Sequence, residues 1–129
     1  MAEDSNHELT FIEDEEYFVH RFSGAITIEL IMQGMQLLRE HPGYHPNIPV
    51  LWDLTGTKVD NIFSPDMLKF GRQVADRVVE AKRATRISML VKSDIQFAVA
   101  RQFVNLAGWA DQQILVTRSD SEAVRWVTR

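Results

Sequence analysis

The chain has 129 residues, of which 45% are hydrophobic and 25% charged, and this composition fits one globular domain spanning 1–129. The absence of cysteine excludes disulfides, thiolate metal sites and cysteine nucleophiles, and no apolar run approaches the roughly 20 residues of a transmembrane helix. The net charge of -4 arises from an acidic segment at 1–16, and the mildly basic remainder lacks the basic aromatic stripe expected of a nucleic-acid-binding surface.

The amino-terminal segment predicts a frayed end followed by a β-hairpin. Its acidic start lacks the basic-then-apolar order of an export signal, so we expect a cytoplasmic protein with 1–7 frayed. Alternating apolar residues predict strands at 8–12 and 17–22, and the acidic turn at 13–16 is short enough to join them directly.

The histidines of the chain are interpreted as structural residues. His20 lies on the same predicted strand face as Phe18 and Phe22, so we expect it to be partly buried with its hydrogen bonds satisfied. His41 and His45 stand in a proline-rich loop without a third ligand nearby. The sequence therefore predicts no metal site and no cofactor.

A helix is predicted at 28–40, with Thr27 as its N-cap. Its apolar arc is wider than one sheet face requires, which indicates cover by a neighbouring element or a surface for a dimer or an apolar ligand. The candidate residues for such a surface, some from later segments, are Ile28, Met32, Met35, Phe97 and Trp109.

The segment 50–54 predicts a buried central strand that ends at an acid and small turn-forming residues. Because ligands of α/β proteins collect at the carboxyl ends of strands, the following residues are candidates for phosphorylation or partner contact. These candidates are Asp53, Thr55, Thr57 and Ser64. Ser64, followed by a proline, also has the features of an N-cap for a helix that extends to about 83.

The remaining segments alternate between strand and helix. Strands are predicted at 86–91 and 113–117, with a helix capped by Ser93 or Asp94 between them and a closing helix after the capping-box spacing at 119–122. The predicted order is ββαβαβαβα, an α/β fold in which four helices cover a mostly parallel, five-stranded sheet.

This order resembles the SpoIIAA-like proteins, relatives of the STAS domain of anti-sigma-factor antagonists. The resemblance rests on 22–27 before the first helix and 50–54 before the second, and it covers about 8–128. It implies a non-catalytic regulatory domain that contacts a protein partner or a second copy, and we expect a homodimer. In phosphorylated antagonists a serine at the start of the next helix is modified, and Ser64 is its nearest counterpart here.

Two other functions remain as alternatives, and a third, catalysis, is not expected. The segments 11–15 and 50–54 loosely resemble the acidic cluster and phosphoacceptor strand of response-regulator receivers, with Asp53 as acceptor. The STAS fold also has a distant likeness to lipid-carrying CRAL-TRIO domains, which implies an apolar ligand such as a lipid. No spacing connects the polar candidates into an acid-base or nucleophilic set; they are Asp53, Asp60, His20 and Ser64.

Overall fold

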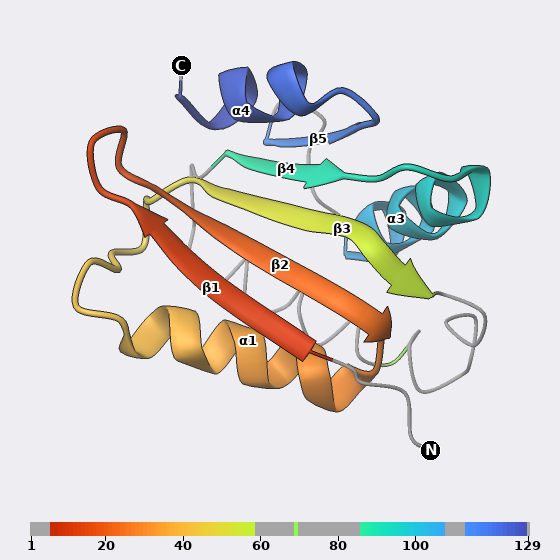
Figure 1. The fold of residues 1–129 in the computed structure, drawn as a ribbon, viewed down its shortest axis with the longest axis horizontal. Helices are drawn as coiled ribbons and strands as arrows, with labels where there is room; N and C mark the ends of the chain where they lie inside the picture. The colour runs from red at the N-terminus through yellow and green to blue at the C-terminus, as the bar shows by residue number, and fades with distance from the viewer. Residues whose placement is uncertain (1–5, 59–68, 70–85, 108–112, 129) are drawn as a thin grey trace.

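The structure of the protein is a computed structural model that describes residues 6–58, 69, 86–107 and 113–128 (Figure 1). Within these ranges a single sheet is combined with helices on both of its faces. The elements are β1 (Asn6–Ile12), β2 (Tyr17–Ala25), α1 (Ile28–Glu40), β3 (Val50–Lys58), β4 (Ile87–Leu90), α3 (Asp94–Ala107), β5 (Ile114–Thr117) and α4 (Asp120–Thr128).

The sheet has five strands in the sequential order β1-β2-β3-β4-β5. β1 runs antiparallel to β2, and the other neighbouring strands are parallel. The sheet is therefore mixed, which corrects the expectation of a mostly parallel sheet. The physical reason is the short turn after Ile12, because a parallel partner would need a crossover of a dozen or more residues.

The described residues contain three helices, where the sequence predicted four. The predicted helix between Ser64 and 83 lies outside the described residues except at position 69. The α/β class and the five strands are confirmed, whereas the fourth helix stays a prediction.

The order of the strands decides which face each helix covers. When parallel strands follow one another in one direction, right-handed crossovers place the connecting helices on the same face. Accordingly α1 and α3 pack on one face around Phe22, Trp52 and Met89, while α4 packs on the opposite face over Leu51 and Leu90 (Figure 1). In the part of the chain that is described, no helix is long and apolar enough to cross a membrane.

The helix starts follow the predicted capping. The Leu30 amide donates to Thr27 Oγ1 at 3.1 Å, which confirms Thr27 as the N-cap of α1. At α3 the Gln96 amide donates to Ser93 Oγ, and Gln96 Oε1 accepts from the Ser93 amide, so Ser93 rather than Asp94 is the cap. At α4 the Glu122 amide donates to Ser119 Oγ, which is one half of the predicted capping box.

Three strands, β1, β2 and β3, are longer than the sequence predicted. β1 begins at Asn6, so His7 belongs to the sheet rather than to a frayed terminus. β3 continues to Lys58, because β2 continues beside it with Ser23 opposite Gly56 and Ala25 opposite Lys58. Asp53 therefore lies in the middle of β3 and not at its end, and residues 55–58 form strand rather than turn.

Candidate functional site

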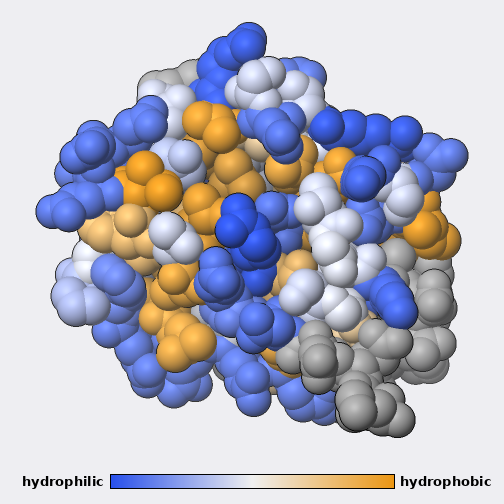
Figure 2. All heavy atoms as spheres, in the orientation of Figure 1, coloured by the Kyte–Doolittle hydropathy of each residue, from blue (hydrophilic) through white to orange (hydrophobic). Residues whose placement is uncertain are grey.

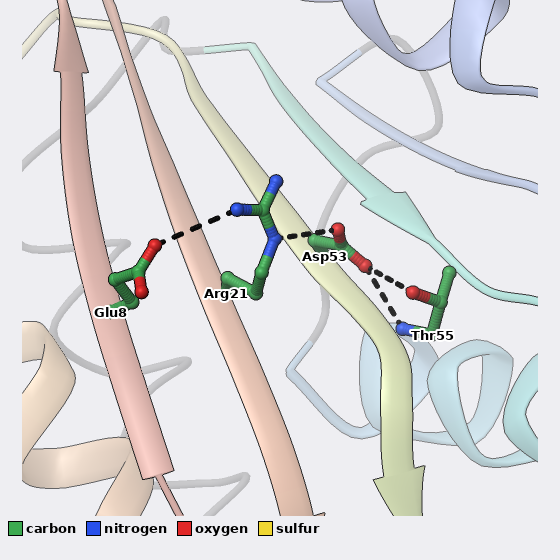
Figure 3. Close-up of polar contacts among 4 residues, drawn as sticks. All are labelled: Glu8, Arg21, Asp53 and Thr55. Atoms are coloured by element: carbon green, nitrogen blue, oxygen red, sulfur yellow. Dashed lines mark hydrogen bonds and ion pairs between the residues drawn. The ribbon is translucent and has the colours of Figure 1, made fainter.

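Four polar side chains form a row across β1, β2 and β3 on the sheet face that α4 partly covers (Figure 3). We call this row, made of Glu8, Arg21, Asp53 and Thr55, the Arg21 ladder. The strand register places Glu8 opposite Arg21 and Arg21 opposite Asp53. Arg21 Nε donates to Asp53 Oδ2 at 3.1 Å, and Arg21 NH1 lies 3.6 Å from Glu8 Oε1.

Asp53 makes the most hydrogen bonds of the four residues in the Arg21 ladder. Its Oδ1 accepts from the Thr55 amide at 3.0 Å and from Thr55 Oγ1 at 2.7 Å, while its side chain is only 14% exposed. Burial raises the pKa of Asp53, but the hydrogen bonds from Thr55 and the charge of Arg21 outweigh burial and lower the pKa overall. The carboxylate is therefore a fixed negative charge with both oxygens occupied.

The strand pattern explains why these residues meet. Side chains two positions apart on a strand lie on the same face of the sheet. Asp53 therefore shares its face with Leu51, which packs against α4, and Arg21 shares that face with Val19. Beyond Arg21 the pairing of β2 with β3 shifts register, and such bulges are common beside functional sites. The Arg21 ladder thus begins where the apolar cover from α4 ends.

Removing the carboxylate of Asp53 is expected to cost more stability than removing Arg21. The Asp53→Ala variant loses three hydrogen bonds at a largely buried site, so we expect a loss of about 2 kcal/mol in the free energy of unfolding. The Arg21→Ala variant removes a side chain that is 56% exposed, so we expect the free energy of unfolding to fall by only about 0.5 kcal/mol. Urea denaturation of both variants and of the double variant measures this. Equal costs for the two single variants would contradict the assignment.

Thr57 and Gln96 extend the site along β3. β4 ends at Leu90, so it does not extend beside the far end of β3. Gln96 Nε2 replaces that strand by donating to the carbonyl oxygens of Thr55 at 3.2 Å and Thr57 at 3.0 Å. Thr57 is buried, and its hydroxyl donates to the Leu54 carbonyl at 2.6 Å. Thr57 is therefore placed as a structural residue, whereas Thr55 belongs to the Arg21 ladder.

A pair of histidines lies on the opposite face of the same strands. His7 Nε2 and His20 Nδ1 are 2.7 Å apart, and the rings pack against Phe22 and Trp52. His20 is fully buried, where partial burial was predicted. Its Nε2 has no hydrogen-bond partner among the described residues, so the prediction that all its hydrogen bonds are satisfied is not met there. Burial and, to a lesser extent, the neighbouring His7 lower the pKa of His20 to about 3, and burial also lowers the pKa of His7.

The predicted apolar surface does not come together in the described residues. Met35 and Phe97 are partly buried against the main core, and the Arg118 guanidinium lies over the Phe97 ring at 5.3 Å. Met32 is exposed on α1. Trp109 and the side chain of Ile28 lie outside the described part, as does Ser64.

Four residues of these sites were not predicted from the sequence: Glu8, Arg21, His7 and Gln96. Arg21 and Glu8 alternate with apolar residues on their strands, which indicates that their side chains lie on the more exposed face of the sheet. Only the pairing of β1, β2 and β3 brings their charges to Asp53. Gln96 was detectable, because Ser93 and Gln96 have the spacing of a capping box. His7 was missed because the terminus was predicted to be frayed up to that residue.

The comparisons with known proteins concern the fold. No protein-family model matches the sequence, and no curated protein matches it either. Among solved structures, the chain is similar to an uncharacterized protein of the DUF3478 family with a SpoIIAA-like fold from Shewanella loihica PV-4. The two share 15% sequence identity with a TM-score of 0.62, over 98% of this chain and 96% of the other. At this identity the likeness shows the SpoIIAA-like fold alone.

Proposed function

We propose that the chain is a non-catalytic domain that regulates a protein partner by direct contact. The SpoIIAA-like fold supports this, because the resemblance to anti-sigma-factor antagonists implies action through binding. The Arg21 ladder is the contact surface in this proposal. It offers exposed groups on Glu8 and Arg21, which are set in place by the less exposed Asp53.

The observation that carries the proposal is the state of Asp53. A general acid or base works best with a pKa near the operating pH and needs reach to its substrate. The pKa of Asp53 is lowered instead, and its oxygens are occupied by Thr55 and Arg21. This arrangement favours a fixed charged surface over proton transfer, and it favours recognition by a partner that carries complementary charges.

A pull-down from lysate of the source cell tests the proposal. The purified chain is immobilised, and retained proteins are identified by mass spectrometry for wild type, Arg21→Ala and Arg39→Ala. Arg39 is a matched control, because it is also exposed but lies on α1, on the other side of the sheet. We expect a partner that wild type and Arg39→Ala retain and Arg21→Ala loses. A partner that binds all three equally contradicts the Arg21 ladder as the contact surface.

Two tests for phosphorylation distinguish this proposal from a function as a phosphorylation switch. The receiver alternative requires Asp53 to accept a phosphoryl group, and we expect no labelling by acetyl phosphate with magnesium, because the carboxylate is engaged. Ser64 as a phosphorylated switch is tested by the intact mass of protein from the source cell. A phosphorylated species at Ser64 would make the partner contact switchable, and labelling of Asp53 would favour the receiver alternative.

The apolar-ligand alternative is tested by native mass spectrometry of the purified protein. Met35 and Phe97 pack against the core, so two of the candidate residues already have apolar partners within the chain. We expect no bound lipid. A lipid that stays with the protein through purification would favour the carrier function over protein contact.

A further inference from the structure

β1 is an edge strand of the five-stranded sheet. Its backbone pairs with β2 along the full length from Asn6 to Ile12. No other segment among the described residues forms backbone hydrogen bonds with its second side, and Figure 1 shows β1 at the free border of the sheet. An unpaired strand edge is a template for another strand.

Of the features that usually protect an edge strand, β1 has one, the charged residue Glu8. Natural proteins shorten such strands, interrupt them with bulges, or place lysine or proline on them. β1 has seven residues, NHELTFI, with no lysine or proline, and it pairs with β2 without a register shift. β5, the strand at the opposite border, has only four residues. The edge at β1 is thus the one suited to pairing.

An exposed apolar side chain of α1 lies beside this edge. A Cβ on Gly34 would lie 2.9 Å from His7 Nε2, and the His41 ring is 5.4 Å from that of Phe11, so both positions face β1. Leu37 follows Gly34 by three residues and precedes His41 by four, which places it on the same flank of the helix. Its side chain is 50% exposed. In Figure 2 hydrophobic side chains form separate groups among hydrophilic ones on this face of the molecule.

We propose that β1 pairs with β1 of a second copy of the chain, antiparallel and around a two-fold axis near Leu9. Leu9 is the midpoint of the strand, so this register pairs all of Asn6–Ile12 and forms one sheet across both copies. Glu8, the acidic residue of the strand, then lies opposite Thr10 of the second copy, and like charges do not meet. Leu37 of each copy borders the new interface and supplies apolar contact beneath the joined strands.

A matched pair of substitutions on α1 tests the helix flank. Leu37→Glu places a carboxylate at the interface, whereas Met32→Glu changes a side chain of similar exposure (47%) about 140° around the same helix. Sedimentation at several protein concentrations, at low and high salt, measures the dimer dissociation constant. We expect Leu37→Glu to raise it at least about tenfold and Met32→Glu to change it less than about twofold. A chain that is monomeric at all concentrations overturns the proposal.

Single cysteines test the strand register, since the natural chain has none. With the axis at Leu9, Glu8→Cys of one copy faces Thr10→Cys of the other at a spacing that a disulfide accepts. Under mild oxidation we expect a mixture of the two variants to cross-link more than either alone, and Asp14→Cys in the exposed turn to stay monomeric. Cross-linking at Asp14 alone, or equal loss of the dimer in both helix variants, overturns the proposal. If Glu8→Cys instead cross-links to an unrelated protein in lysate, the partner of β1 is a strand of that protein and the proposed self-pairing is overturned.

Discussion

Replacing Gln96 by alanine is expected to lower the free energy of unfolding by about 3 kcal/mol or more. The side chain is buried and makes four hydrogen bonds to backbone groups. Its Oε1 accepts from the amides of Lys92 and Ser93, and its Nε2 donates to the carbonyls of Thr55 and Thr57. Alanine leaves these groups without their partner in a site with little access to water, which is why the cost is high.

Two further variants separate the roles of Gln96. Gln102→Ala removes an exposed glutamine from the same helix, and a change below about 0.5 kcal/mol is expected. Gln96→Glu keeps the acceptor for α3 but cannot donate to β3, so amide exchange is expected to speed up at residues 55–58 while the start of α3 stays protected. Urea denaturation and hydrogen exchange followed by NMR measure these effects. A Gln96→Ala variant as stable as Gln102→Ala would refute the bridging role.

Acid is expected to destabilise the protein through the His7–His20 pair well before most carboxylates titrate. The pKa of His20 is lowered to about 3, against about 6.5 for an unfolded chain, so the unfolded state binds a proton that the folded state rejects. The stability due to neutral His20 is fully present above pH 6.5 and is lost progressively as the pH falls toward 3. Through His20 alone the free energy of unfolding is expected to fall by about 2 kcal/mol between pH 8 and pH 5. His7 acts in the same direction, because its pKa is also lowered.

A phenylalanine at position 20 isolates this effect. His20→Phe keeps a ring beside Phe22 and Trp52 but removes the titrating group, so the decline in stability between pH 8 and pH 5 is expected to become much smaller. His45→Gln, at an exposed loop histidine, is the control for the loss of a histidine elsewhere in the chain. The lowered pKa of Asp53 acts only below its ordinary value of 3.8 and does not enter this range. Equal pH profiles for wild type and His20→Phe would contradict the prediction.

Some of the candidate site was predictable because it depends on local spacing. Asp53 and Thr55 are two apart on one strand, so their hydrogen bonds need only the strand itself. The capping at Thr27 and the alternation that buries His20 are equally local. By contrast, Gln96 reaches Thr57 across 39 positions of sequence, and no periodicity in either segment encodes that distance.

The sequence by itself determined the α/β class, the positions of most strands and helices, and the resemblance to SpoIIAA-like proteins, because apolar periodicity and capping are short-range signals. Only the tertiary structure decided that β3 continues to Lys58, that Arg21 joins Glu8 to Asp53, and that His7 meets His20. Each of these depends on strand pairing, in which residues distant in sequence become neighbours through backbone hydrogen bonds that look alike at every position. The register of β1, β2 and β3, more than the identity of any one residue, places the charges of the Arg21 ladder side by side.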